Sequence, residues 1–300
     1  MNKLIRMIRD RAFRVAILAK YGLLNWMSDE QFLKLRWRTL RGNVELNLQQ
    51  PKTYNEKLQW LKIHDRKPIY TTMVDKLAAR DFVKERIGEE YLIPLLAVWE
   101  RFEDIDLNQL PKEFVLKCTH DSGSYYICRD KSKFDWKAAE KRLKKSLKRN
   151  YFPHSREWPY KNAVPRIIAE PYLEDAEYKE LRDYKFFTFG GVPKILYITQ
   201  GRGSGKETTA DFFDMEFRHL DLTMDHEMSD VPPDCPKNFA LMKELAAILS
   251  KDTPQLRVDF YEVNGKVLFG EMTFFHCGGF EKINPPEWNR IFGDWVELPR

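Results

Sequence analysis

The sequence has few cysteines and no long hydrophobic run. Its 300 residues include only four cysteines, none in a CxxC pair. This set gives neither a disulfide framework nor a zinc motif, so we expect a reducing compartment. No apolar stretch approaches the roughly 18 residues that span a bilayer, and the apolar run at 15–19 is too short for a signal peptide. We therefore expect a soluble, cytoplasmic protein.

The chain also lacks a strong excess of one charge. Its 50 Lys and Arg against 45 Asp and Glu give a net charge of +5. Such a mild excess suits phosphate-bearing or polyanionic ligands, but it does not predict a nucleic-acid partner. The sequence predicts no particular oligomeric state.

The first part of the chain reads as helical. Residues 3–20 carry six basic side chains and one acid, with apolar residues on one stripe, which predicts one basic amphipathic helix. Such a helix either lies at an anionic membrane surface or packs on its own domain. Ser28 and Gln31 form a capping-box pattern before a helix that Gly42 ends, and further helices are expected at 55–64 and at 75–87, before Gly88. We expect these helices to have a supporting or docking role.

From residue 113 onward, short apolar runs alternate with turn residues. They predict strands at FVLKC, SYYIC, RIIAE, YKFFTF, KILYIT, RVDFYEV and KVLFGEMTF. Helical patterns intervene at 136–149 and 237–250. The sequence therefore predicts a mixed α+β body with antiparallel hairpins.

The segment RVDFYEVNGKVLFGEMTF, at 257–274, predicts a hairpin around Asn264 and Gly265. A two-residue turn would place Asp259 and Glu271 on opposite faces of the sheet. A three-residue loop would pair residue 262 with residue 266 and bring the polar side chains to one side: Arg257, Asp259, Glu271 and Thr273. We expect the three-residue loop, in which Gly265 takes the left-handed position that closes a type I turn with a bulge. Hard oxygen donors on one face then suit Mg²⁺ carrying phosphates. The alternative is a solvated face with an Arg–Asp ion pair.

Four segments in order, FVLKCTHDSGSYYIC, EPYLED, DYKFFTFGG and RVDFYEVNGKVLFGEMTF, resemble the TupA-like ATP-grasp family, named after a protein of teichuronopeptide biosynthesis. The resemblance extends from about residue 51 to residue 299. It implies an ATP-grasp fold, in which ATP lies between two antiparallel sheet lobes. We accordingly expect a helical region at 1–108, a small lobe with the phosphate loop at 109–172, and a large lobe at 173–300.

The resemblance also implies roles for individual residues. Lys117 matches the lysine that contacts the nucleotide phosphates, and Lys185 lies on a strand from which it reaches a phosphate. The expected phosphate loop includes Ser122, Gly123 and Ser124, and the hinge that takes adenine includes Glu170, Tyr172 and Leu173. Either Glu177 or Asp183 binds ribose; the alternation of Asp183 and Lys185 on one strand face favours Asp183.

On the C-terminal hairpin, Asp259 and Glu271 match the Mg²⁺ ligands of the family, and Arg257 matches the arginine that stabilises a developing oxyanion. Thr273 stands where many relatives have Asn, which shortens the reach of a third metal ligand.

The function that the resemblance implies is an ATP-dependent carboxylate–amine ligase working through an acyl phosphate. Its implied substrates are a uronic acid of a bacterial surface polysaccharide and an amino acid. The basic N-terminal helix then fits work at the inner face of the cell membrane. The alternatives are a glycosyltransferase of the same pathway and a nucleotide-binding module without catalysis.

Three other segments contain patterns that are found in some functional sites. GRGSGK, at 201–206, lacks the P-loop spacing and has Glu207 where Ser or Thr is required, so we expect a hairpin or substrate loop. Asp104 and Asp106 form a DxD pattern that some glycosyltransferases use, but three-letter acidic motifs are common. The strongly basic stretch 131–149 suits a solvated face or the attraction of a polyanionic sugar chain.

Overall fold

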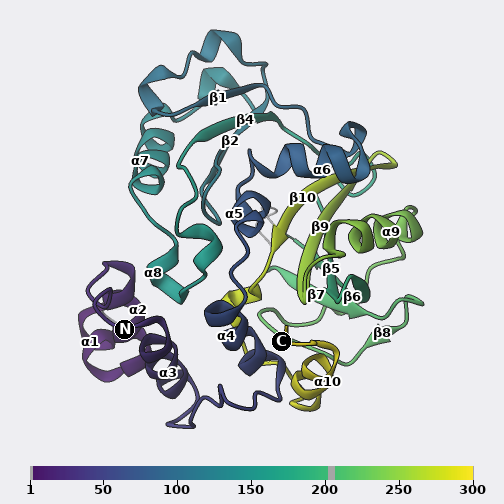
Figure 1. The fold of residues 1–300 in the computed structure, drawn as a ribbon. Coiled ribbons are helices and arrows are strands. Elements are labelled where there is room, and N and C mark those ends of the chain that lie inside the picture. The colour runs from purple at the N-terminus through teal and green to yellow at the C-terminus, as the bar shows by residue number, and fades with distance from the viewer. Residues whose placement is uncertain (1–2, 202–206, 300) are drawn as a thin grey trace.

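A computed structural model describes residues 3–201 and 207–299. These residues form two antiparallel sheets with helices around them (Figure 1). The small sheet has the order β1-β4-β2-β3, with strands Ala97–Trp99, Ile167–Pro171, Phe114–Cys118 and Tyr125–Cys128. The large sheet has the order β10-β9-β5-β6-β7-β8, with strands Lys266–Thr273, Gln255–Val263, Asp183–Phe189, Val192–Gln200, Thr209–Phe213 and His219–Leu220. The expected α+β architecture is confirmed.

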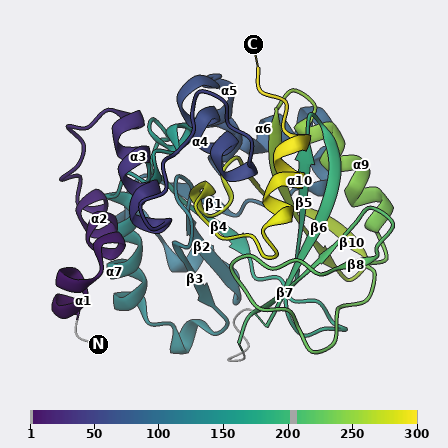
Figure 2. The same ribbon diagram turned by 90° about the horizontal axis from the view of Figure 1, so that it is seen from below.

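The described residues contain ten α-helices: α1 Lys3–Arg9, α2 Arg11–Lys20, α3 Asp29–Leu40, α4 Tyr54–His64, α5 Ile69–Val74, α6 Ala79–Ile87, α7 Trp136–Leu147, α8 Phe152–Ser155, α9 Phe239–Ser250 and α10 Glu287–Trp295. Helix α7 packs on β2 and β3, whereas α9 packs on β5, β6 and β9. Helices α1–α3 form a group apart from the large sheet (Figures 1 and 2). No helix in the described ranges is long and apolar enough to cross a membrane.

Two helix expectations were wrong in detail. The single helix expected at 3–20 is two helices, because the Asp10 side chain accepts a hydrogen bond from the Phe13 backbone N–H and starts a new helix there. The helix expected from residue 75 begins at Ala79, since the Asp75 carboxylate accepts from the N–H groups of Leu77 and Ala78 in a preceding turn. The capping box at Ser28 is confirmed.

The main core lies between the large sheet and its covering helices. Phe186 on β5 and Phe260 on β9 are fully buried, and Phe186 stacks on Phe239 of α9. On the other face, Phe187 and Phe189 pack against Phe292 of α10. Each buried phenylalanine contributes about 1.5–3 kcal/mol. The odd-numbered side chains of β5 therefore share one face with α10 at one end of the strand, and the polar residues Asp183 and Lys185 lie at the other end.

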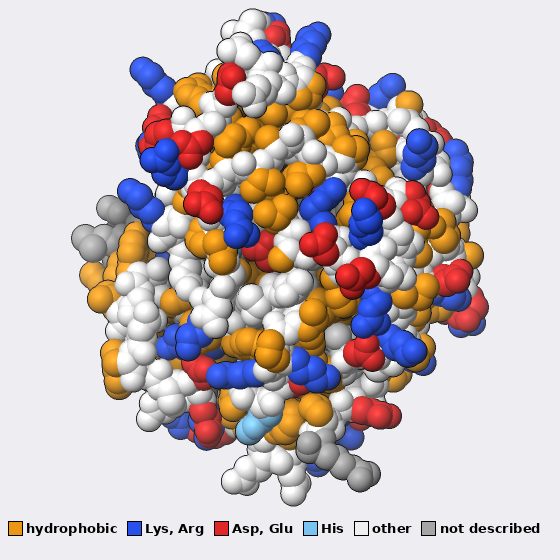
Figure 3. Space-filling view, turned by 45° about the horizontal axis from the view of Figure 1, so that its top comes forward, with side chains coloured by type: hydrophobic (Ala, Val, Ile, Leu, Met, Phe, Trp, Pro, Cys, Tyr) orange, Lys and Arg blue, Asp and Glu red, His pale blue; other side chains and the backbone are white. Residues whose placement is uncertain are grey.

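The surface carries both signs of charge. On the face drawn in Figure 3, Lys and Arg side chains are interspersed with Asp and Glu. This agrees with the small net charge of +5.

Candidate active site

Three ionisable side chains lie in one row across three neighbouring strands. Lys185 on β5 is the register partner of Asp259 on β9, which is the partner of Glu271 on β10. In the next row, Arg257 on β9 lies opposite Thr273 on β10. Because register partners point to the same face, these five side chains gather on one side of the sheet.

The expected three-residue hairpin loop is wrong. Asn264 and Gly265 form a two-residue turn with φ angles of 52° and 76°, and Val263 pairs with Lys266. Positive φ at both turn residues is the type I′ geometry that Asn-Gly favours. The two acids nevertheless share a face, because β10 contains one extra residue between Phe269 and Glu271.

That extra residue is Gly270. A Cβ atom there would lie 3.0 Å from the backbone oxygen of Asp259 and 3.2 Å from the Tyr261 ring. Glycine therefore allows the two strands to approach where the bulge returns Glu271 to its place opposite Asp259.

Arg257 holds the cluster together. Its Nε donates to Asp259 Oδ1 at 2.7 Å and its Nη2 donates to Asp259 Oδ2 at 2.6 Å. Nη2 also lies 3.2 Å from Glu271 Oε1 and 3.0 Å from Thr273 Oγ1, and Nη1 lies 2.7 Å from His276 Nδ1. Of five N–H groups, one on Nη1 has no partner among the described residues. The guanidinium is thus rigidly held, with one donor left for a ligand.

The charges in this cluster depend on one another. Burial opposes the charge of Arg257, but Asp259 and Glu271 outweigh it and raise the pKa of the guanidinium. Burial likewise opposes ionisation of Glu271, but Lys76, Arg257 and Lys185 lower the pKa of its carboxyl. For Asp259, burial raises the pKa, against the pull of Arg257 and Lys185. Glu271, whose side chain is 37% exposed, is therefore the acid most ready to receive a ligand as an anion.

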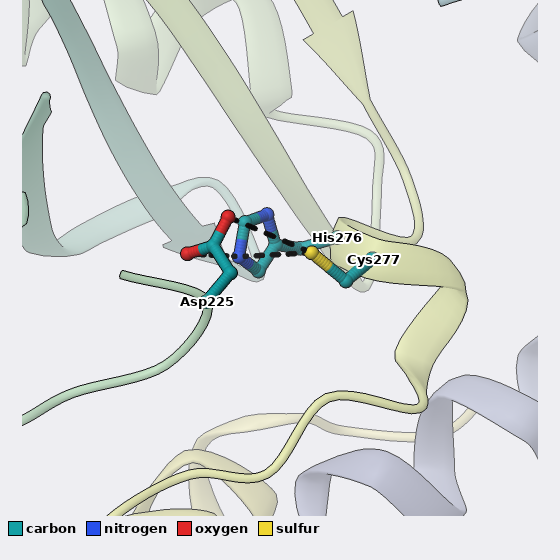
Figure 4. A group of neighbouring side chains, drawn as sticks. All are labelled: Asp225, His276 and Cys277. Carbon is teal, nitrogen blue, oxygen red and sulfur yellow. Dashed lines mark hydrogen bonds and ion pairs between the residues drawn. The ribbon is translucent and has the colours of Figure 1, made fainter. Parts of the chain in front are cut away.

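A second cluster contacts Arg257 through His276; Figure 4 shows its three side chains. Asp225, His276 and Cys277 lie together: His276 Nε2 is 3.7 Å from Cys277 Sγ and 3.8 Å from Asp225 Oδ1. Tyr197 donates its hydroxyl hydrogen to Asp225 Oδ1 at 2.5 Å. Asp225 lies in the segment after β8, Tyr197 lies on β6, and His276 and Cys277 lie in the 3-10 helix His276–Gly279. The cluster thus joins these three elements to Arg257.

Residues of these three types can bind a metal ion, but the histidine tautomer argues against it. Arg257 can only donate, so Nδ1 of His276 accepts and the ring proton of the neutral imidazole sits on Nε2. Burial is the main cause that lowers the pKa of His276, which keeps the ring neutral. Burial and Asp225 raise the pKa of the Cys277 thiol to about 12. With protons on both Nε2 and Sγ, the cluster is a hydrogen-bonding support.

These groups border a cavity of 570 Å³. The part of its wall that belongs to the large sheet consists of Lys185, Tyr197, Thr199, Arg257, Glu271 and Thr273. Ser122 of the expected phosphate loop also lines it, as do residues from outside that sheet: Arg36, Arg41, Tyr151, His154, Glu157 and Phe280. The volume suits a ligand of small-molecule size.

On the small sheet, Lys117 and Glu170 form an ion pair. Lys117 Nζ donates to Glu170 Oε2 at 2.6 Å, between the neighbouring strands β2 and β4. Burial raises the pKa of Tyr261 on β9, and Glu170 adds to this together with Asp183, Asp259 and Glu271 of the large sheet. The carboxylate of Glu170 on the small sheet thus acts on the same hydroxyl group as three carboxylates of the large sheet.

The expected phosphate loop is anchored by its neighbours. Gly123 has φ 79°, and its carbonyl accepts from Arg142 of α7 at 2.8 Å. The Ser124 hydroxyl donates to the Asp121 carboxylate, while Lys76 donates to the Asp121 carbonyl. The basic helix predicted near residue 140 thus touches the loop through Arg142.

The two candidates for ribose binding lie in different surroundings. Asp183 is buried and pairs with Lys185 Nζ at 3.0 Å. Glu177 is exposed and pairs with Lys237 Nζ at 3.0 Å. In the hinge, Tyr172 donates its hydroxyl hydrogen to Glu174, and Leu173 follows it, half-buried.

The acids of the DxD pattern have structural partners, and most of the GRGSGK segment lies outside the residues that the structure describes. Asp104 forms an ion pair with Arg101 at 2.6 Å, and Asp106 caps a short 3-10 helix through the Asn108 N–H. Both acids of the DxD pattern are thus occupied. Most of the segment 201–206 lies outside the described residues; Gly201 donates its N–H to Glu180 at 2.9 Å.

Sequence reasoning missed the residues that support or complete the site. Asp225 and His276 are 51 positions apart and both lie outside the motif segment 257–274, and Arg36 and Arg41 lie in and just after a helix assigned only a supporting role. No local pattern in the sequence marks them.

We compared the chain with known proteins. No curated protein matches the sequence significantly. Among solved structures, D-alanine–D-alanine ligase from Bacillus anthracis has a TM-score of 0.39 and 16% identity, over 68% of this chain and 57% of that one. The same enzyme from Helicobacter pylori has a TM-score of 0.44 and 10% identity, over 83% and 67%. L-amino acid ligase from Bacillus licheniformis has a TM-score of 0.43 and 12% identity, over 73% and 47%.

The chain spans less than two thirds of the first and third of these proteins, and every TM-score is below 0.5. The assignment therefore rests on the sequence family. A sequence model described as TupA-like ATPgrasp matches residues 56–297. Because this match covers well over half of the chain, the chain belongs to the TupA-like ATPgrasp family.

Proposed function

We propose that the protein is an ATP-dependent carboxylate–amine ligase. The observation that carries the proposal is the row of Lys185, Asp259 and Glu271 beside Arg257, in a chain of this family. Lys185, Glu271 and Arg257 line the cavity, and Asp259 is buried next to them. In the proposed reaction a substrate carboxylate attacks the γ-phosphorus of ATP, which gives an acyl phosphate and ADP. An amine then attacks the acyl carbon, phosphate leaves, and an amide forms.

Residues of this chain have separate roles in the two steps of that reaction. Lys117 and Lys185 neutralise phosphate charge, each as a flexible ammonium group. Arg257 keeps one Nη1 hydrogen for the oxygen that gains negative charge in the tetrahedral intermediate. Asp259, His276 and Thr273 hold the guanidinium in place, so no reorganisation is needed during the reaction. Glu170, Tyr172 and Leu173 take the adenine, Asp183 takes the ribose, and the loop of Ser122, Gly123 and Ser124 covers the phosphates.

Mg²⁺ fits the donors that are present. Asp259 and Glu271 are register partners with carboxylate oxygens, the hard ligands that Mg²⁺ prefers, and the Thr273 hydroxyl adds a neutral oxygen. Bound there, Mg²⁺ would neutralise phosphate charge and orient the triphosphate.

A thermal-shift experiment tests the nucleotide. We expect Mg·ATP at a hundredfold excess over its Kd to stabilise the protein by about 2.7 kcal/mol, because it binds only the folded state. UDP-sugars should leave the melting temperature unchanged. Stabilisation by UDP-sugars alone would indicate a glycosyltransferase instead. Binding of Mg·ATP without ADP release, across a panel of uronic acids and amino acids, would indicate a binding module.

For the substrates, we propose a uronic acid of a bacterial surface polysaccharide as the carboxylate and an amino acid as the amine, as the family resemblance implies. We also propose that 109–172 and 173–300 act as the two lobes around ATP, with 1–108 as a helical region. The cationic residues of the cavity wall support an anionic substrate.

We propose further that this cytoplasmic protein contacts the inner face of the membrane through residues 6–26. Cations at positions 6, 9, 11, 14 and 20 are exposed there. Exposed apolar side chains accompany them: Ile8 at 69%, Tyr21 at 66%, Leu23 at 61% and Trp26 at 79%. Exposed aromatic and basic side chains together suit an anionic headgroup region.

Vesicle sedimentation tests this contact. We expect binding to phosphatidylglycerol vesicles but not to phosphatidylcholine vesicles, weakening as salt rises. Trp26→Ser should reduce the bound fraction several-fold. The control is Val231→Ser, at a residue 78% exposed and distant in sequence. Equal binding by both variants, or no preference for the anionic lipid, would refute the contact.

A further inference from the structure

Three buried nitrogen atoms near the cavity have no hydrogen-bond partner. They are Nε of Arg36, Nε of Arg41 and Nδ1 of His154. All three residues line the 570 Å³ cavity, and they come from α3, its C-terminal end and α8. A buried donor without a partner costs about 1–3 kcal/mol, so a ligand that accepts from these groups would recover that cost.

The two guanidinium groups are held by backbone oxygens instead of acids. Arg36 Nη1 donates to the Ala12 carbonyl at 2.9 Å. Arg41 Nη2 donates to the carbonyls of Phe280 and Glu281 at 3.2 and 2.9 Å. In the ranges 3–201 and 207–299, neither arginine has a carboxylate within ion-pair distance. Both charges are fixed in position but not neutralised by a contact.

Three of the four acids in the cavity wall have partners of their own, and the fourth, Glu281, raises the pKa of Arg41 from beyond ion-pair distance. Asp225 accepts from Tyr197. Glu157 accepts from the Ser155 hydroxyl at 2.5 Å, and burial raises the pKa of its carboxyl against the effect of the buried Lys62 ammonium, which lowers it. The three partnered acids are therefore not available to neutralise Arg36 and Arg41.

The pKa values of the three subsite residues reflect their burial and the charges around them. Burial lowers the pKa of Arg36 and of Arg41. Burial also lowers the pKa of His154 to about 4, and Arg36, Arg149, Lys20 and Lys62 lower it further in the same direction. Asp10 and Glu281 oppose the effect of burial on Arg36 and Arg41, whereas around His154 the positive charges outweigh the negative ones, which favours an anion beside that ring.

We propose that Arg36, Arg41 and His154 form a subsite for a second anionic group of the acceptor substrate, a carboxylate or a phosphate. This deepens the proposed function and rests on it: Arg257 serves the reacting carboxyl group, and the subsite serves a different anion on the same molecule. The acceptor is accordingly a molecule with at least two anionic groups, such as an oligomer of uronic acids or a phosphate-linked uronic acid.

Two of the three subsite residues, Arg36 and Arg41, lie outside the family match, whereas His154 lies within it. That match begins at residue 56, whereas α3 lies at Asp29–Leu40. Helix α3 is fixed by its capping box and by a core cluster containing Phe32, Leu33 and Trp37, against which Phe280 of the matched region packs. The N-terminal helices thus supply specificity as well as support.

Calorimetric titration of the full chain, without ATP or Mg²⁺, tests the subsite. The probes are glucuronic acid, digalacturonic acid and glucuronic acid 1-phosphate. We expect at least one dianionic probe to bind about tenfold or more tightly than glucuronic acid, since charge-assisted hydrogen bonds are the strong ones. Tighter binding of digalacturonic acid identifies a carboxylate as the second anion, and tighter binding of the 1-phosphate identifies a phosphate.

Variants locate the effect. Arg36→Gln and Arg41→Gln should each remove most of the advantage of the dianionic probe, with little change in binding of glucuronic acid. The control is Arg38→Gln, on the same helix, whose exposed side chain pairs with Glu45 and does not line the cavity. Melting curves of all three variants show whether they are folded.

The proposal is overturned if the three probes bind wild type equally, or if Arg38→Gln loses as much as Arg36→Gln. Because the titration needs no nucleotide, its failure is separate from a failure of Mg·ATP to stabilise the protein. Preference for a dianion together with ADP release would support both proposals.

Discussion

Replacing Asp259 with asparagine should lower the rate of ADP release about 10³-fold, equal to about 4 kcal/mol of transition-state stabilisation. Asp259 lies between Lys185 and Glu271 in the row of three strands and accepts both bonds of the Arg257 fork. Asparagine keeps the shape but removes the negative charge, so both the proposed metal site and the clamp on Arg257 are weakened. The measurement is ADP release at saturating Mg·ATP.

A control must separate this loss from unfolding. Removing one partner of a buried ion pair costs about 3–5 kcal/mol of stability, so the melting temperature of Asp259→Asn has to be measured as well. Glu271→Gln is the second test, because a side chain that is 37% exposed tolerates neutralisation better. Glu216→Gln, at a side chain 68% exposed in the β7–β8 turn, should retain activity. Full ADP release by both site variants would refute the metal assignment.

The strands of this protein were predictable because each is short, apolar and bounded by turn residues. All seven expected strands are present, and the expected helices near 136 and 237 are within two residues of α7 and α9 at their starts. The strands that were missed are β1, β7 and β8; β1 and β8 have only three and two residues. Patterns of that length carry no periodicity.

In the C-terminal hairpin, Asp259 and Glu271 share one face of the sheet, as expected, but the expected three-residue loop is not the cause. Asn264 and Gly265 form the two-residue turn that their residue types favour. The bulge at Gly270, five residues after Gly265, determines which face of the sheet Glu271 occupies. A bulge depends on the approach of two backbones, which alternation of polar and apolar residues does not reveal. Sequence reasoning placed the irregularity in the turn, whereas the structure has it inside the strand.

The residues that support Arg257 and those of the cationic subsite could not be predicted from the sequence, for a different reason. Asp225, His276 and Arg36 come from segments up to 240 positions apart, and none lies in a recognisable motif. Their proximity depends on how α3, the segment after β8 and the end of β10 pack together. A single sequence holds no direct record of such contacts.

Replacing Gly293 with alanine should destabilise the protein by about 3 kcal/mol, the upper range for overpacking. In an exposed helix the same change stabilises by about 1 kcal/mol, since alanine is the better helix former. Here a Cβ atom would lie 2.2 Å from the Lys52 carbonyl oxygen and 2.9 Å from the backbone nitrogen of Tyr54, where α10 packs on the start of α4. These atoms are backbone, so no side-chain rotation relieves the contact.

The consequence should extend beyond the two helices. Tyr54 is buried, donates its hydroxyl hydrogen to Gln255 of β9 at 3.1 Å and packs edge-on against Phe292. Separating α10 from α4 therefore disturbs the strand that carries Arg257 and Asp259. Urea unfolding measures the change. Asp294→Ala, at an exposed residue of the same helix, is the matched control and should alter stability by about 0.5 kcal/mol or less. An unfolding midpoint for Gly293→Ala at or above that of wild type would show that α10 does not pack on α4 as closely as described.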